Sequence, residues 1–258
     1  MKLIGVDVGF SEKRKTTGIA CLDDDKLYCS KAGTSWESRK TLIPSGFQPK
    51  LIALDGPLLP QGVDELVHRQ CEFAFIDAPF SSRCKPGLSH WGTGLKLRRA
   101  AEQAAAQFGQ LLGGSFPSAA ETFVRREGPI VEAFPNAFLG VLLSEEDFQF
   151  APKPSRGKRF DWLYERAVGN RRLESILAES SGLPSEFWRR LNTEKDHDLR
   201  ASLICLLTAA FAAKGTASII GEAESGWFWL PPSSVWQSWA RDGLRSSAAK
   251  RGLNLAAT

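Results

Sequence analysis

The sequence lacks the residue patterns that are typical of secreted and zinc-binding proteins. Its five cysteines form an odd set without a Cys-x-x-Cys pair, and no histidine lies near them at zinc-ligand spacing. These absences argue against a disulfide framework and a zinc knuckle, and we expect a reducing, cytoplasmic location. The start MKLIGVDVG becomes polar too early for the apolar segment of a signal peptide. The longest later apolar run, residues 203–213, is too short to cross a bilayer, so we expect no membrane partner.

The sequence also has no strong excess of charge and no internal repeat. Thirty-three Lys and Arg residues against 29 Asp and Glu residues leave a formal net charge of +4, which permits a polyanionic partner without requiring one. Hydrophobic residues make up 43% and charged residues 24%, as in typical globular domains. We therefore expect one folded domain over residues 1–258, a length within the range of single α/β domains.

Short apolar segments predict strands. Residues 2–8, 17–22 and about 26–31 are apolar runs separated by a polar loop and an Asp-rich turn, which predicts three antiparallel strands at the start of the chain. Two further apolar runs, at 51–55 and 129–134, are each stopped by Gly or Pro and predict two more strands.

Helical patterns occupy much of the remaining chain. Gly113-Gly114 closes an alanine-rich segment, and Asp196 and Gly215 are suitable cap residues for the last strong helix. The tail after about residue 242 is basic, and we expect it to be frayed. The predicted helices cover residues 95–112, 160–179, 185–192 and 196–214.

Four acidic residues are candidate ligands of a metal ion. Asp7, Asp55 and Glu132 each lie in or at the end of an apolar segment and are followed within three residues by Gly or Pro. Ionised carboxylates among buried strands need a cation, because an unpaired charge in a low-dielectric interior is costly. Asp198 adds an acid from a helix whose same face carries small residues. Since hard divalent ions take oxygen ligands, the four acids predict a catalytic site for Mg²⁺ or Mn²⁺.

Each acid also has an ordinary structural explanation. An aspartate at a strand end often serves only as a turn or cap residue, and the Asp-x-Gly of residues 7–9 is common to nucleases and phosphate-binding kinases. IALDGP at 52–57 is echoed by AFIDAP at 74–79, so either Asp55 or Asp77 could end the fourth strand. Helical spacing of apolar residues before Asp77 favours Asp55.

Two basic clusters lie in predicted loops. Such clusters are either solvated loop residues or contacts to phosphate groups. If nucleic acid binds, we expect it at Lys13, Arg14 and Lys15 in the first cluster and at Arg156, Lys158 and Arg159 in the second.

Several longer motifs follow one another along nearly the whole chain. Because these motifs occur together and in this order, the chain resembles the predicted nucleases catalogued as domain of unknown function four-two-nine, within the ribonuclease H-like superfamily. The motifs are GVDVGF at 5–10, TGIA at 17–20, IALDGPL at 52–58, VEAFPNAF at 131–138, DHDLRASLICLLTAAFAA at 196–213 and GEAESGWFWLP at 221–231.

This resemblance implies an α/β fold with a mixed five-stranded sheet, whose first three strands are antiparallel, flanked by helices. It also implies that Asp7, Asp55 and Asp198 surround the metal, with Glu132 entering from the fifth strand. Similar proteins often carry a second aspartate three residues after the helix acid, where this chain has Ala201. Binding of one metal ion and binding of two metal ions therefore remain alternatives.

The resemblance implies a metal-dependent nuclease that hydrolyses phosphodiester bonds of DNA or RNA. An alternative from the same superfamily is an ATP-using phosphotransferase, in which the turn at residues 7–9 and the loop at 13–15 would face the phosphates. The chain leaves little room for the second lobe that such enzymes need. A third alternative is a nucleic-acid-binding protein without catalytic activity.

Overall fold

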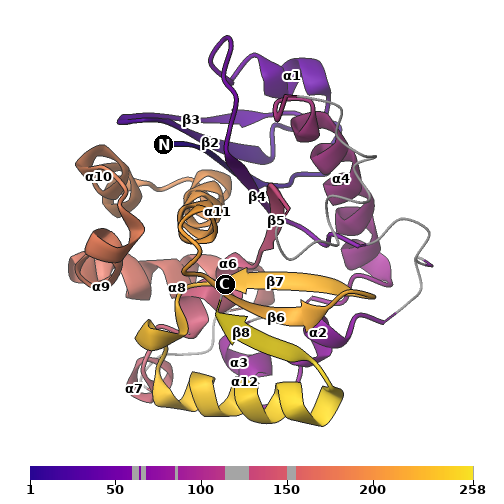
Figure 1. Cartoon of the computed structure of the whole chain (residues 1–258), viewed down its shortest axis with the longest axis vertical. Helices are drawn as coiled ribbons and strands as arrows, with labels where there is room; N and C mark the ends of the chain where they lie inside the picture. Colours follow the sequence, from indigo (N-terminus) through magenta and orange to yellow (C-terminus); the bar gives the residue numbers. More distant parts are fainter. Residues whose placement is uncertain (60–63, 65–67, 85–86, 114–127, 150–154, 258) are drawn as a thin grey trace.

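One mixed sheet of eight strands runs through the protein in the computed structural model (Figure 1). The structure describes residues 1–59, 64, 68–84, 87–113, 128–149 and 155–257. Across the sheet the strands follow the order β3-β2-β1-β4-β5-β7-β6-β8. The strands are β1 (Lys2–Asp7), β2 (Thr17–Asp23), β3 (Lys26–Ala32), β4 (Leu51–Asp55), β5 (Ile130–Ala133), β6 (Ser218–Glu222), β7 (Gly226–Leu230) and β8 (Asn254–Ala257).

Helices flank this sheet, with α4 on one side and α8 to α11 on the other (Figure 1). Within the described ranges, every helix is too short or too polar to span a lipid bilayer. The helices are α1 (Trp36–Lys40), α2 (Gln70–Phe73), α3 (Phe80–Arg83), α4 (Gly92–Gly109), α6 (Pro135–Gly140), α7 (Glu145–Gln149), α8 (Arg159–Val168), α9 (Arg172–Ser181), α10 (Ser185–Thr193), α11 (His197–Ala213) and α12 (Ser238–Arg251).

The predicted strands and helices are largely present. The first three strands are antiparallel, as predicted, and β4 and β5 follow in parallel with β1. The helix predicted over 160–179 is divided into α8 and α9, because Asn170 and Arg171 adopt left-handed backbone conformations between them.

The predicted number of five strands is wrong. The aromatic segment near the C-terminus forms β7, which pairs in parallel with β5 and turns back antiparallel to β6. The tail after residue 242, for which the sequence predicts a frayed end, continues as α12 and then as β8 on the outer edge of β6. Backbone pairing with β6 holds this tail, and that pairing has no local signal in the sequence.

Alternation along β1 divides the core into two layers. Leu3 belongs to the apolar cluster that contains α11, whereas Ile4 and Val6 belong to the cluster that contains α4. Every residue of α11 from Leu199 to Phe211 is buried. The helix is therefore enclosed by the sheet on one side and by the other helices on the opposite side.

Two glycines bring α11 directly onto the sheet. A methyl group at Gly5 of β1 would overlap the backbone of Leu206 and Ser202, and one at Gly18 of β2 would overlap the carbonyl oxygen of Asp198. The backbone of α11 thus lies against the strands without side chains between them. As a consequence, the first turn of α11 lies over the ends of β1 and β2.

We predict that Gly18→Ala destabilises the protein by about 1–3 kcal/mol or more, because the added methyl group forces α11 away from β2. The midpoint of urea unfolding measures this change. Gly33→Ala is the matched control, since its methyl group would meet Ser38 Oγ at 3.5 Å, an ordinary contact distance. Equal midpoints for the two variants would show that the close approach contributes nothing.

Candidate carboxylate site

Two of the candidate acids lie side by side at the end of the sheet. Asp7 is the last residue of β1 and pairs directly with Asp55, the last residue of the parallel strand β4. On its other side Asp7 pairs with Gly18 of β2, and Gly18 pairs with Lys31 of β3. Directly paired residues in a sheet point to the same face, so this row directs Lys31, Asp7 and Asp55 towards α11.

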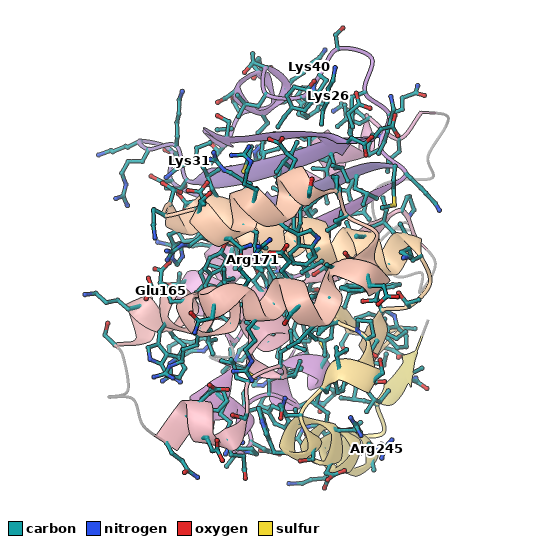
Figure 2. All side chains as sticks on the ribbon, turned by 90° about the vertical axis from the view of Figure 1, so that its left-hand side faces the viewer. Lys26, Lys31, Lys40, Glu165, Arg171 and Arg245 are labelled. Carbon is teal, nitrogen blue, oxygen red and sulfur yellow. The ribbon has the colours of Figure 1, made fainter. Side chains whose placement is uncertain are left out.

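The third acid enters this row from the first turn of α11. Lys31 of β3, labelled in Figure 2, places its Nζ atom 2.6 Å from Asp198 Oδ2. The same Nζ atom lies 2.9 Å from Oδ2 of Asp196. Asp196 caps the helix, because its Oδ1 accepts the backbone N–H groups of Asp198 and Leu199. The N-cap role predicted for Asp196 is therefore confirmed, while the metal-binding role predicted for Asp198 stays a prediction.

Repulsion between these carboxylates contributes to a raised pKa of Asp7. Burial raises the pKa of Asp7 well above its ordinary value, and the charges of Asp55 and Asp198 raise it further. Lys31 opposes this shift but does not remove it. The three acids are therefore close enough to destabilise one another when all are ionised, and an additional cation would relieve that repulsion.

The donor chemistry of this cluster suits a hard divalent ion, although its present arrangement is not that of a formed metal site. Carboxylate oxygens are the preferred ligands of Mg²⁺ and Mn²⁺. Among the described residues, however, no group of three or more His, Cys, Asp or Glu side chains is arranged to hold a metal ion. Lys31 pairs with Asp198 and so competes for the oxygen atoms that a metal ion would use.

Glu132 lies on the opposite face of the sheet. It pairs in register with Leu54, which faces α4, whereas its neighbour Ala133 is the residue opposite Asp55. Its carboxylate accepts two hydrogen bonds from Arg69, at 2.9 and 2.6 Å, and one from the backbone N–H of Leu58 at 2.8 Å. The structure therefore does not bring Glu132 to the other three acids, because a shift of one residue along a strand reverses the face.

The environment of Glu132 is that of a buried ion pair. Burial raises its pKa to about 7, while the adjacent Arg69 guanidinium acts in the opposite direction. Arg69 is completely buried and also contacts Glu72 and the ring of Phe228. This pair connects β5 to the segment before α2 and gives the carboxylate of Glu132 a structural partner.

Asp77 does not compete with Asp55 for the strand-end position. It follows α2 and forms an ion pair with Arg251 of α12, at 2.8 Å. Of the two basic residues that follow it closely in the chain, Arg83 pairs with Glu145 and Lys85 lies outside the described residues. Asp55 is therefore the acid at the end of the fourth strand.

A pocket of about 790 Å³ opens beside Asp7 and Asp55. Its other lining residues come from four distant parts of the chain, including Phe134 after β5, Phe160 of α8 and His197 of α11. Sequence reasoning missed these residues, because no local pattern connects them to the acids. Aromatic residues in apolar segments normally predict only core packing.

Each basic cluster includes exposed residues that lie close in the chain to a residue of this site. Lys13, Arg14 and Lys15 are exposed in the loop that follows β1 and therefore Asp7. In the second cluster Lys158 is exposed at the start of α8, next to Gly157, which lines the pocket. Arg159 lies over the ring of Trp162, and the side chain of Arg156 is outside the described part of the structure.

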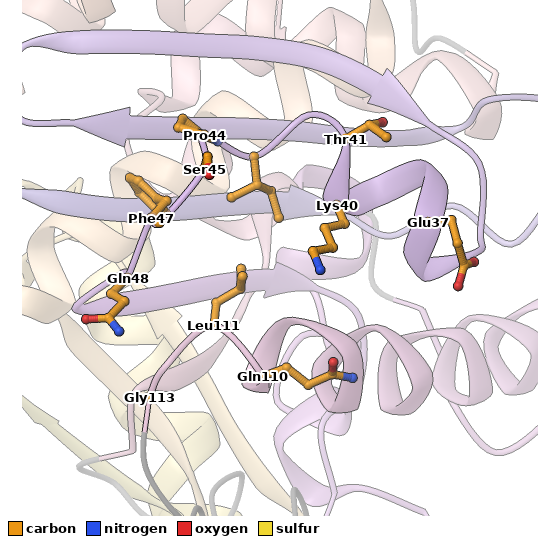
Figure 3. A pocket seen from close by; sticks show the side chains of 12 residues that line it. Glu37, Lys40, Thr41, Pro44, Ser45, Phe47, Gln48, Gln110, Leu111 and Gly113 are labelled. Atoms are coloured by element: carbon orange, nitrogen blue, oxygen red, sulfur yellow. The ribbon is translucent and has the colours of Figure 1, made fainter.

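A second hollow, also of about 790 Å³, is separate from this site. It lies between α1 and the end of α4, where Lys40, Gln110 and Leu111 line it (Figure 3). None of the candidate acids reaches it. Of these two hollows, the one beside Asp7 and Asp55 is therefore the one that contains candidate acids.

Comparisons of the chain with protein-family models, with curated proteins and with solved structures find no match. The resemblance in the sequence motifs thus stays a prediction.

We predict that Asp7→Asn stabilises the metal-free protein at about pH 7. The raised pKa of Asp7 means that its ionisation costs folding free energy as the pH rises above about 4, and asparagine avoids this cost. Thermal unfolding in the presence of a chelator should show a higher Tm, by about 2–4 °C for each kcal/mol relieved. The advantage should shrink as the pH falls towards and below about 4, because Asp7 then becomes protonated in the unfolded state as well.

The control for this variant is Asp25→Asn, at an exposed turn acid before β3. Its Tm should remain at the wild-type value throughout. A lower Tm for Asp7→Asn than for wild type at about pH 7 would contradict the repulsion inferred here.

We also predict that Arg69→Gln lowers the free energy of unfolding by about 3–5 kcal/mol, because the buried carboxyl group of Glu132 loses its cation and must either stay ionised at high cost or bind a proton. Arg189→Gln breaks an exposed pair with Glu186 and should cost less than about 1 kcal/mol. Urea unfolding measures the loss of unfolding free energy for each of these two variants. Adding Glu132→Gln to Arg69→Gln should recover part of the loss, and no recovery would indicate that the charge is not its cause.

Proposed function

We propose that the protein is a metal-dependent phosphodiesterase that hydrolyses nucleic acid. The observation that carries this proposal is the convergence of Asp7, Asp55 and Asp198 on one end of the sheet, beside a pocket. Carboxylates in this arrangement are suited to holding Mg²⁺ or Mn²⁺, which are the ions used in phosphoryl chemistry.

The order of the strands supports the relation to the ribonuclease H-like superfamily. Strands β3-β2-β1-β4-β5 are adjacent in that order, with an antiparallel meander first and parallel strands after it. This agrees with the fold that the sequence motifs imply. Strands β7, β6 and β8 extend the sheet beyond β5 and lie away from the acids.

In the proposed site, Asp7, Asp55 and Asp198 would hold the metal ion. When bound, the ion would polarise the phosphate group and lower the pKa of a water molecule. Ala201 lines the pocket in the place where similar proteins often carry another aspartate, so the side chains favour one ion over two. Lys31 contributes a second positive charge in the same row, and its ammonium group can bind a phosphate oxygen.

The surroundings of the acids support a polyanionic substrate. Exposed lysines and an arginine follow β1, and Lys158 lies next to the pocket. Such groups release counterions when they contact phosphates, which gives binding that weakens as salt is added. The local positive charge therefore compensates for the acids, which would otherwise repel nucleic acid.

The test compares Asp55→Asn with Asp77→Asn, because the two acids have similar sequence surroundings but lie in different places. For wild type and Asp77→Asn, Mn²⁺ at about 100 times its Kd should stabilise the fold by about 2.7 kcal/mol. Both should also cleave labelled DNA or RNA. Asp55→Asn should lose the stabilisation and the cleavage while it remains folded.

Other outcomes would reject this proposal in favour of a specific alternative. Hydrolysis of ATP without cleavage of nucleic acid would indicate a phosphotransferase. Tight binding of nucleic acid with neither reaction would indicate a binding protein. Mn²⁺ that stabilises none of the three proteins would remove the metal site altogether.

A further inference from the structure

The pocket beside the acids has an unusual exposed aromatic residue at its opening. Trp91 lines this pocket, directly before α4, and is 65% exposed. A large apolar ring left in water is unfavourable for a free protein, and such rings commonly provide a surface for a ligand. In proteins that bind single-stranded nucleic acid, exposed aromatic rings stack on unpaired bases.

The inner wall of the pocket continues this aromatic surface. Phe134 and Phe160 line it and are 9% and 2% exposed. The volume of about 790 Å³ lies within the range of about 300–1,000 Å³ that is usual for small-molecule sites. A single nucleotide fits this volume, whereas the stacked bases of a duplex would not present a free base to it.

One polar group inside the pocket has no partner. The Oδ1 atom of Asn136 is buried without a hydrogen bond to any described group, although Asn136 lines the pocket. A buried amide oxygen without a partner is unfavourable. The amide of asparagine can donate and accept hydrogen bonds, which suits the edge of a base.

The residues that line the pocket differ in charge from the residues around it. The lining residues within the described part of the chain include Asp7 and Asp55 but neither lysine nor arginine. Apart from a metal ion held by Asp7 and Asp55, a phosphate group therefore has no cation among these lining residues, while Lys158 next to Gly157 and Lys31 beside Asp198 offer cations outside the pocket. This separation favours an uncharged aromatic group inside and phosphates at the edge.

We propose that this pocket binds one unpaired nucleobase of single-stranded nucleic acid, stacked on Trp91, with the adjoining phosphate directed to the acids. This inference rests on the proposed function and adds the structural class of its substrate. It implies a preference for single strands or unpaired positions over continuous duplex.

The experiment measures binding of a labelled unstructured oligonucleotide and of its duplex by fluorescence anisotropy, with Ca²⁺ in place of Mn²⁺. Trp91→Ala should weaken single-strand binding by about 5- to 150-fold, the range for loss of one base–aromatic stack. Trp91→Phe should retain most of the affinity. Tyr28→Ala, at an exposed aromatic residue of β3, is the control and should bind as wild type does.

Two further readouts distinguish stacking from a structural defect. The salt dependence of binding should be the same for Trp91→Ala and wild type, because stacking releases no counterions. The Tm should also be unchanged. Equal losses for single strand and duplex, or no loss for either, would overturn the proposal, and so would a free mononucleotide that binds as tightly as the oligonucleotide.

Failure of this inference can be separated from failure of the proposed function. Metal-dependent cleavage that is unaffected in Trp91→Ala, with unchanged single-strand binding, would reject the base pocket alone. Single-strand binding that depends on Trp91, without any metal-dependent cleavage, would reject the phosphodiesterase and keep the pocket.

Discussion

The structure depends on the direct contact between the backbone of α11 and strands β1 and β2. Gly5 and Gly18 have no side chains, so the helix lies against the sheet at two points. This contact buries the helix from Leu199 to Phe211 and fixes the distance of its first turn from the strand ends. A bulkier residue at either glycine would raise the helix and separate Asp198 from Asp7. The core and the candidate site therefore rely on the same close approach.

Charge balance is the second constraint, and the protein meets it differently on the two faces of the sheet. Towards α11, the described residues place Asp7, Asp55 and Asp198 near the ammonium group of Lys31, which also pairs with Asp196, and the pKa of Asp7 stays raised. Towards α4, the carboxylate of Glu132 has a two-point contact with Arg69. A satisfied ion pair holds elements together, whereas an excess of negative charge leaves a capacity to bind cations. The difference explains why the proposed chemistry belongs to the first face alone.

Several features follow from local sequence patterns. Asp7 and Asp55 end apolar runs that are stopped by glycine, and strands end where such runs end. Asp196 precedes an apolar segment and caps it, which leaves Asp198 inside the first turn. Glu132 has the same local pattern as the other acids, yet its side chain points the other way. Local pattern predicts that a residue lies in a strand, but the register between strands decides which face it takes.

By itself the sequence determined the mixed α/β class, the first antiparallel strands, the helix that carries Asp198 and the two strand-end aspartates. These depend on hydrophobic periodicity, caps and chain breakers, which act over a few residues. Only the tertiary structure decided the addition of β6, β7 and β8, the pairing of Glu132 with Arg69, and the grouping of Trp91, Phe134 and Phe160 beside the acids. Each of these joins segments far apart in the chain, and such contacts form through packing and backbone pairing that no short stretch of sequence encodes.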